Sequence, residues 1–170
     1  MAEQIAELEV VVSRIDVEAD VVGERARHLF TAGTPGTVVL VHAARDGEPA
    51  YEVEFPLTGG RGALATLRAS DVRKVPSGYR RACPCCGYRT LADLCPGSWE
   101  VCPVCFWEDD PVQWEHPAEL VGGANRVSLS DARANYLAFG ACDRGALAHV
   151  RQPLPNEQPN QEVGDHDARR

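Results

Sequence analysis

The chain has 170 residues, a formal net charge of −8 at pH 7 and a hydrophobic content of 44%. This length fits one ordinary domain or two small ones, and the composition is that of a soluble globular protein. No apolar run approaches the roughly 18–20 residues that a membrane-spanning helix needs. The acidic segment from Met1 to Glu9 has neither the basic nor the apolar region of a signal peptide. We therefore expect a cytoplasmic protein with no membrane partner, in which clustered cysteines bind metal rather than form disulfides.

The negative charge is spread evenly along the chain. Residues 1–76 contain 12 acidic and 8 basic residues and residues 77–170 contain 13 and 9, so each part has a net charge of −4. The one local basic cluster is Arg73-Lys74 with Arg80-Arg81. Nucleic-acid-binding domains usually present a basic face, because neutralising phosphates supplies most of their non-specific affinity. The charge pattern argues against a nucleic acid partner, although it leaves that class open.

The first 76 residues have the pattern of short strands separated by turns. The segment Tyr51–Phe55 alternates between large apolar and acidic residues, as a half-buried strand does, and Asp46-Gly47 is a hairpin signal. Short strands at such spacing predict a small closed or nearly closed barrel. The five predicted strands are Leu8–Arg14, Gly36–His42, Ala50–Phe55, Ala63–Arg68 and Val72–Val75.

Other segments define the expected domain organisation. Residues 17–34 fit the strand pattern poorly and are interpreted as a helical turn or an irregular insertion. Pro76-Ser77-Gly78 marks a boundary. Ser128 is the predicted N-cap of one helix over residues 129–139, which Gly140 would end. The polar, proline-rich residues 152–170 are expected to be disordered. We predict an α+β protein with domains at 1–76 and 77–151.

Two cysteine pairs carry the strongest chemical signal. Cys83/Cys86 and Cys102/Cys105 are both C-x2-C motifs, and fifteen residues lie between them. A C-P-x-C turn points two sulfurs to the same side of a tight loop, and two such turns facing each other form a closed tetrahedral Zn²⁺ site. Zinc binding would then supply folding energy to a segment whose own core is thin. The sequence predicts one structural zinc ion.

The remaining cysteines leave alternatives open. Cys85 lies inside the first pair and Cys95 midway between the pairs, so either could replace a ligand or act as a redox thiol. Cys142 is better explained as a buried core residue. Iron held as in rubredoxin is a further alternative. A redox dithiol is disfavoured, because Gly87–Thr90 has the pattern of a turn into a strand rather than the helix that usually follows such a motif.

Motifs beyond the cysteine pairs carry a family resemblance. They are Cys83–Tyr88, Thr90-Leu91, Pro96–Glu100, Val101–Asp110, Gly122–Asn125, Val127–Leu129, Ala132-Arg133, Asn135 and Phe139–Ala141. With them, residues 82–151 resemble the cysteine-rich CPCC family of mostly bacterial proteins. The resemblance implies a small zinc-ribbon-like domain and no particular reaction. Cys95 and Cys142 lie outside the family pattern, which favours leaving both out of the ligand set.

The first half carries a second resemblance. Gly36–Val39, Tyr51–Phe55, Leu64–Leu67 and Asp71–Arg73 make it similar to a family of small bacterial SH3-like barrels, from which residues 17–34 depart by their length. Members of such families often lie beside toxin-like genes. The resemblance therefore implies, by association only, an immunity or antitoxin role.

The rest of the sequence indicates binding rather than catalysis. No serine–histidine–aspartate arrangement, phosphate-binding glycine loop or H-E-x-x-H motif is present, so we expect no enzyme. The acidic surface suits a basic protein partner. A nucleic-acid- or ribosome-associated factor and a zinc–thiol redox sensor remain alternatives. Trp107, Glu108, Asp109 and Asp110 are the candidate partner surface, against the simpler interpretation of a tryptophan in a small core beside a solvated acidic loop.

Overall fold

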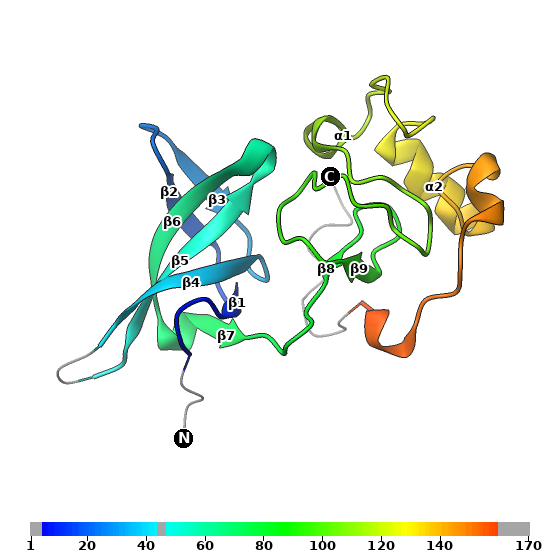
Figure 1. Cartoon of the computed structure of the whole chain (residues 1–170). Coiled ribbons are helices and arrows are strands. Elements are labelled where there is room, and N and C mark those ends of the chain that lie inside the picture. The colour runs from blue at the N-terminus through cyan, green and yellow to red at the C-terminus, as the bar shows by residue number, and fades with distance from the viewer. Residues whose placement is uncertain (1–4, 44–46, 160–170) are drawn as a thin grey trace. The chain divides into compact units, whose positions relative to one another are not determined.

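A computed structural model describes residues 5–43 and 47–159 of the chain (Figure 1). It divides into two compact units, the first ending at Ser77 and the second beginning at Gly78. Among the described residues, no helix is long and apolar enough to cross a membrane. Each unit is built around a hydrophobic cluster of its own.

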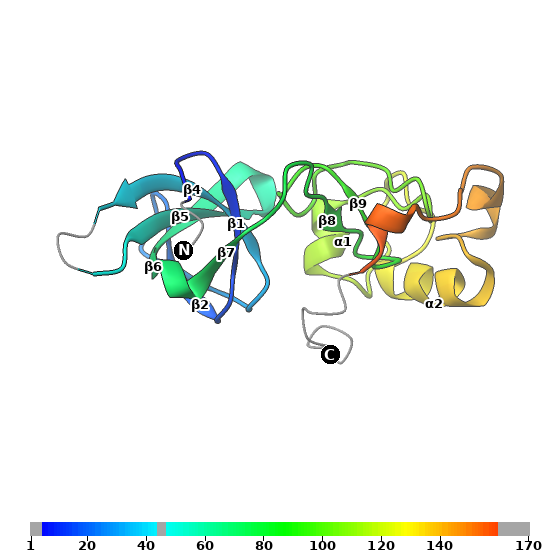
Figure 2. The same ribbon diagram turned by 90° about the horizontal axis from the view of Figure 1, so that it is seen from below.

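The first unit is one curled antiparallel sheet of seven strands (Figures 1 and 2). Their order across the sheet is β3-β2-β6-β5-β4-β1-β7, which leaves β3 and β7 as edges. The central pair β5 and β6 is in register from Ala50↔Arg68 to Leu57↔Arg61. The strands are β1 (Val10–Ser13), β2 (Val17–Val21), β3 (Arg27–Phe30), β4 (Pro35–His42), β5 (Ala50–Leu57), β6 (Arg61–Arg68) and β7 (Val72–Lys74).

The core of this unit lies on the inner face of the sheet. Tyr51, Val53 and Phe55 are buried while the side chains between them face outward, so the predicted alternation in this strand is confirmed. Gly36 on β4 allows the close packing, because a Cβ atom there would lie 2.6 Å from Cγ1 of Val53. The five predicted strands are present, with bounds shifted by up to two residues.

The interpretation of residues 17–34 as a helical turn or insertion is wrong. They form the hairpin of β2 and β3, in register from Val17↔Phe30 to Asp20↔Arg27. Strand β2 alternates apolar and acidic residues over only five positions, and Arg27 then pairs with Glu18 and Asp20 on its outer face. The predicted turn at Asp46-Gly47 falls between β4 and β5, but Asp46 lies outside the described residues.

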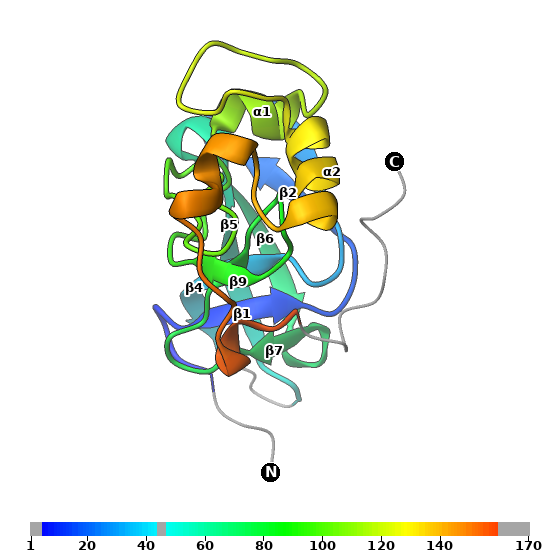
Figure 3. The same cartoon turned by 90° about the vertical axis from the view of Figure 1, so that its right-hand side faces the viewer.

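The second unit contains little regular structure (Figure 3). Its two-stranded sheet pairs β8 (Arg81–Ala82) with β9 (Arg89–Leu91). Helix α2 (Leu129–Phe139) has the predicted bounds: the Ser128 hydroxyl accepts from the backbone of Asp131, and Gly140 ends the helix with a φ of 84°. Helix α1 (Pro111–Glu115) was not predicted, because five residues are too few to show helical periodicity.

The chain beyond residue 151 departs from the expected disorder as far as residue 159. Pro155–Glu157 form a 3₁₀ turn, and the Glu157 side chain is buried. Both carboxylate oxygens of Glu157 accept hydrogen bonds from the Arg151 guanidinium, at 2.6 and 2.8 Å. Composition alone predicted a flexible tail, but one bidentate ion pair holds its first turn against the unit. Residues 160–170 lie outside the described part of the chain.

Candidate metal centre

The first cysteine pair lies in a tight turn, residues Cys83–Tyr88, which we call the first knuckle. The backbone N–H of Gly87 donates to the carbonyl of Cys83 at 2.9 Å, and the N–H of Cys83 donates to the carbonyl of Tyr88 at 2.8 Å. Gly87 has a φ of 79°, a conformation in which a glycine avoids steric strain. The turn therefore closes between β8 and β9 and leaves both sulfurs on one side.

The second knuckle, Cys102–Trp107, repeats this geometry. The N–H of Phe106 donates to the carbonyl of Cys102 at 2.8 Å, and the N–H of Cys102 donates to the carbonyl of Trp107 at 2.8 Å. A bridge between Val101 and Glu108 extends the turn as β8 and β9 extend the first. Phe106 takes the place of Gly87 and has a φ of 65°, which is uncommon for a residue with a side chain.

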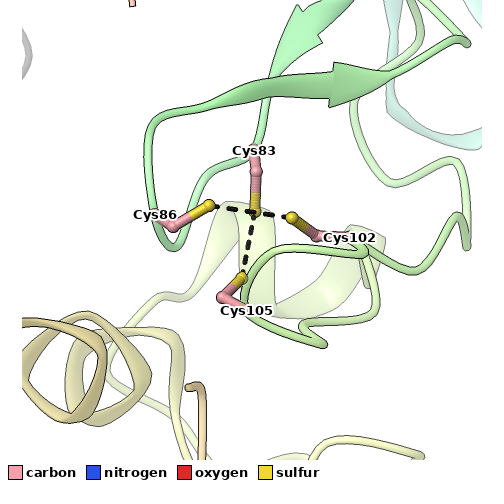
Figure 4. Close-up of side chains that lie close together, drawn as sticks. All are labelled: Cys83, Cys86, Cys102 and Cys105. Atoms are coloured by element: carbon pink, nitrogen blue, oxygen red, sulfur yellow. Dashed lines mark hydrogen bonds between the residues drawn. The ribbon is translucent and has the colours of Figure 1, made fainter. Parts of the chain in front are cut away.

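The two knuckles bring the four predicted sulfurs together (Figure 4). All four Sγ atoms lie within 4.8 Å of one another. The Sγ atoms of Cys83 and Cys105 are 3.6 Å apart and those of Cys86 and Cys102 are 3.7 Å apart. A tetrahedron with metal–sulfur bonds of about 2.3 Å has edges of about 3.8 Å. The site therefore has the size and ligand number of a tetrahedral four-thiolate metal centre.

The four cysteine thiols differ in their tendency to lose a proton, because each lies close to the others. Hydrogen bonds from Cys105, Cys83 and Cys86 hold the pKa of the Cys102 thiol far below its usual value. Burial raises the pKa of Cys83, and the neighbouring Cys102 raises those of Cys86 and Cys105. The pKa shifts of the four thiols are therefore opposed, since that of Cys102 is lowered and those of its three neighbours are raised. A bound dication would remove this conflict, because it stabilises every ligand in the deprotonated form.

Polar groups around the sulfurs fix the ligand cage. The Thr90 hydroxyl, on β9, donates to Sγ of Cys102 at 3.1 Å and so links the two knuckles. The backbone N–H of Cys142 donates to the carbonyl of Cys105 at 2.8 Å. Thr90 is itself buried. Such outer contacts orient metal ligands and tune their basicity.

The other three cysteines lie outside the four-sulfur group. Cys85 and Cys142 are buried in the same hydrophobic cluster, and burial raises the pKa of Cys142 to about 12. Cys95 is half-buried, and its backbone N–H donates to the Asp93 carboxylate at 2.8 Å. All seven cysteines lie among the described residues, and none forms a disulfide there.

The candidate partner surface is not a surface at three of its four positions. Trp107 and Asp109 are 1% and 0% exposed, and Asp110 is buried as well. Asp110 caps helix α1 by accepting from the backbone of Val112 at 2.8 Å. Only Glu108 is half-exposed. The prediction failed because three adjacent acidic residues suggest a solvated loop. In the structure Asp109 is buried against Arg81, Asp110 caps α1, and Glu108 alone stays half-exposed.

Asp109 is the centre of a buried polar cluster. Its Oδ2 forms an ion pair with Arg81 and accepts from the backbone of Gly97 and Ser98 at 2.9 and 3.0 Å, and from the Ser98 hydroxyl. The cluster ties the strand before the first knuckle to the loop before the second. Arg81 therefore does not contribute to a basic surface with its neighbours in the sequence, since its side chain is buried in this ion pair.

Asn125 and Gln113 form a second buried polar cluster, which we call the Asn125 clamp and which the sequence did not predict. The Asn125 amide accepts from the N–H of Glu108 at 3.1 Å and donates to its carbonyl at 2.8 Å, and also donates to Oε1 of Gln113 at 2.8 Å. Gln113 in turn donates to the carbonyls of Val127 and Glu119. A single asparagine seventeen residues away gave no sequence signal for this pairing.

Comparison with known proteins gives one match. Residues 81–157 match the family described as Cysteine-rich CPCC, a range that contains both knuckles and both buried clusters. The first unit lies outside the matched range. Neither the curated proteins nor the solved structures contain a match to the chain.

Proposed function

The second unit belongs to the cysteine-rich CPCC family, and we propose that its four cysteines hold one structural Zn²⁺ in a non-catalytic, protein-binding module. The single observation that carries the proposal is the four-sulfur group, in which two sulfur–sulfur distances of 3.6 and 3.7 Å match the edges of a tetrahedral thiolate site.

Zinc is the proposed metal because of the donor set. Four thiolates on two knuckles suit Zn²⁺, and iron is the alternative that uses similar turns. In a tetrahedral site four protein ligands leave no position for a substrate or a water molecule. The ion would therefore act on the fold and not on a reaction, in keeping with the expectation that the protein is not an enzyme.

The structural role follows from what surrounds the sulfurs. The hydrophobic cluster of the unit contains the four cysteines together with large side chains such as Leu91, Trp107 and Leu129. Among the described residues, the regular structure of this unit is one short strand pair, an isolated bridge, two α-helices and two short 3₁₀ helices. A metal that joins the two knuckles would supply the connection that regular structure does not.

The finer fold assignments are part of the proposal. Two facing knuckles, each closing a short hairpin, support a zinc-ribbon-like second unit. A curled sheet that buries one face supports the SH3-like barrel expected of the first unit, with β2 and β3 as an addition to it.

The proposed partner is a basic protein in the cytoplasm. The specific role that we propose for this binding is immunity- or antitoxin-like. The support is the net charge of −8 and the reduction of the basic cluster on folding: Arg81 is buried against Asp109 and Lys74 pairs with Glu9 at 2.5 Å, while Arg73 and Arg80 remain exposed. Acidic surfaces attract basic partners over long range. The same observations weaken the nucleic acid alternative, and the burial of Cys85 weakens that of a redox sensor.

Native mass spectrometry of the full chain recovered from its own cells tests both metal and partner. We expect one zinc per chain and none in a Cys102→Ser variant, whereas Cys142→Ser and Cys95→Ser, outside the four-sulfur group, should keep it. Iron in place of zinc, or zinc retained by Cys102→Ser, would contradict the metal assignment. A stoichiometric basic protein that dissociates with rising salt would support the partner, and co-purifying RNA or DNA would refute it.

A further inference from the structure

A cavity of about 340 Å³ lies beside the second knuckle and plays no part in the metal site. Its lining comes from three chain segments. They are Val101, Phe106 and Glu108 in and beside that knuckle, then residues 124–126, and then Cys142, Asp143, Gly145, Ala146 and His149. Small-molecule sites usually have volumes of about 300–1,000 Å³ and combine an apolar lining with a few charged groups. We call it the Phe106 pocket, because the Phe106 side chain lines it and is 40% exposed.

Among the charged residues that line this pocket, Glu108 and Arg126 carry opposite charges and do not pair with each other. Neither the Glu108 carboxylate nor the Arg126 guanidinium has a hydrogen bond or ion pair with any part of the chain that the structure describes. The Asn125 clamp keeps these two residues close together. Its amide binds both the N–H and the carbonyl of Glu108, and Arg126 directly follows Asn125 in the chain. Neighbouring opposite charges that stay apart leave room for a group that contacts both.

Gly145 is one of the residues that line the pocket. A Cβ atom at Gly145 would lie 3.0 Å from Oδ1 of Asp143 and 3.3 Å from Nη1 of Arg126. Oδ1 of Asp143 already accepts from the backbone of Ala146 at 3.0 Å. The absence of a side chain at Gly145 therefore keeps the space beside the guanidinium open, in a turn where glycine is not required by a positive φ.

An aromatic pair forms another wall. The rings of Phe106 and His149 are 4.8 Å apart and nearly parallel, at 24°. Phe106 takes a left-handed conformation at the position where the first knuckle has Gly87, and its ring is not in the core. Such a conformation is sterically unfavourable for a residue with a side chain. The Phe106 ring lies outside the core, where it can contact a molecule in the pocket.

From these observations we propose that the Phe106 pocket binds a free α-amino acid in its zwitterionic form. The carboxylate of the ligand lies on the Arg126 guanidinium, its ammonium group on the Glu108 carboxylate, and its apolar side chain on the Phe106–His149 ring pair. A simple anion would face Glu108 and Asp143, and a simple cation would face Arg126. A dipolar ligand satisfies both signs at once, and charge-assisted hydrogen bonds are the strongest that a pocket can offer.

The test uses the full, metal-loaded chain. A ligand-observed NMR screen of the twenty L-amino acids should find saturable binding, with phenylalanine among the best because of the ring pair. In calorimetry, L-phenylalanine methyl ester, which lacks the carboxylate, and N-acetyl-L-phenylalanine, which lacks the ammonium group, should each bind at least about tenfold more weakly. Absence of saturable binding by any of the twenty would overturn the proposal.

Variants tie the binding to the pocket. Arg126→Gln should weaken L-phenylalanine by about tenfold but leave the methyl ester nearly unchanged, because the ester has no carboxylate to lose. Glu108→Gln should likewise weaken L-phenylalanine by about tenfold but leave N-acetyl-L-phenylalanine nearly unchanged, because that ligand has no ammonium group to lose. Arg144→Gln removes an exposed arginine outside the lining and should change nothing. Equal weakening of both ligands by Arg126→Gln would indicate a merely structural effect and refute the proposed contact.

Two further variants separate binding from folding. Gly145→Val should place a side chain in the pocket beside Arg126 and abolish binding. Phe106→Gly gives the second knuckle the residue that the first knuckle has at this position, and it should weaken binding without loss of zinc. Zinc content and circular dichroism are measured on each variant, so a folding defect is recognised independently. Unchanged binding by a folded, zinc-containing Gly145→Val protein would place the ligand elsewhere and overturn the proposal.

Discussion

The Thr90 hydroxyl lies 3.1 Å from Sγ of Cys102 and donates a hydrogen bond to it across the two knuckles. This contact joins a strand of the first hairpin to a ligand of the second. It also adds to the stabilisation of Cys102 as a thiolate, for which the other three thiols supply the larger contributions. A metal centre made by two separate turns therefore has at least one direct link that does not pass through the metal.

Replacing this hydroxyl should weaken metal binding without removing it. In Thr90→Val the shape of the side chain is kept and the hydrogen bond to Cys102 is lost, so we expect zinc affinity to fall by about tenfold, as for other outer-sphere changes. Competition with a chromophoric chelator measures it. Thr66→Val, at an exposed position of the first unit, is the control. An affinity equal to that of the control would show that the hydroxyl contributes nothing.

Removing the metal should unfold the second unit alone. All three tryptophans of the chain, at positions 99, 107 and 114, lie in that unit, and Trp107 is 1% exposed. On zinc chelation we expect the tryptophan emission to shift to the red, while amide protons of β5 in the first unit remain protected from exchange. Unchanged emission from a chain shown to be zinc-free would mean that packing holds the knuckles without metal.

The buried pair of Arg81 and Asp109 should be costly to break. Asp109→Asn keeps the shape of the side chain but leaves the Arg81 guanidinium buried without a counter-charge, and Nη1 of Arg81 already has no partner among the described residues. We expect a loss of about 3–5 kcal/mol in the free energy of unfolding, measured by urea denaturation.

Two comparison variants make this measurement interpretable. Glu119→Gln removes an exposed carboxylate of the same unit and should change stability by less than about 1 kcal/mol. Replacing both partners by apolar residues, in Arg81→Met with Asp109→Leu, should recover part of the loss because no charge is then buried alone. A loss for Asp109→Asn no larger than that for Glu119→Gln would contradict a structural role of the ion pair.

The first unit should show a pH dependence that does not involve the metal. The hydrogen bond from Lys74 holds the pKa of Glu9 below its usual value. Because the folded pKa is the lower one, the pair stabilises the fold above the unfolded pKa of about 4.3 and loses that contribution as the pH falls through the folded pKa. NMR titration of the Glu9 carboxyl carbon measures this, and Lys74→Met should raise the pKa. A Glu9 pKa that is the same with and without Lys74 would refute the link.

Several features were determined by the sequence because they depend on neighbours along the chain. Tyr51–Phe55 alternates at the period of a strand, and Ser128 and Gly140 mark the ends of α2 with residues that cap a helix locally. The two C-x2-C turns each set two sulfurs on one side through hydrogen bonds within six residues. Such signals need no knowledge of the remaining chain, and the predicted strands, helix and cysteine group correspond to them.

Other features were decided only by the tertiary structure. Asp109 and Asp110 are adjacent acidic residues in the sequence, but burial against Arg81 and the N-terminus of α1 gives each a different task. Asn125 reaches Glu108 across seventeen residues, and both residues line the Phe106 pocket. The burial of a charge and the partner of an amide depend on which distant segment packs there, and this is a property of the folded chain that no local pattern contains.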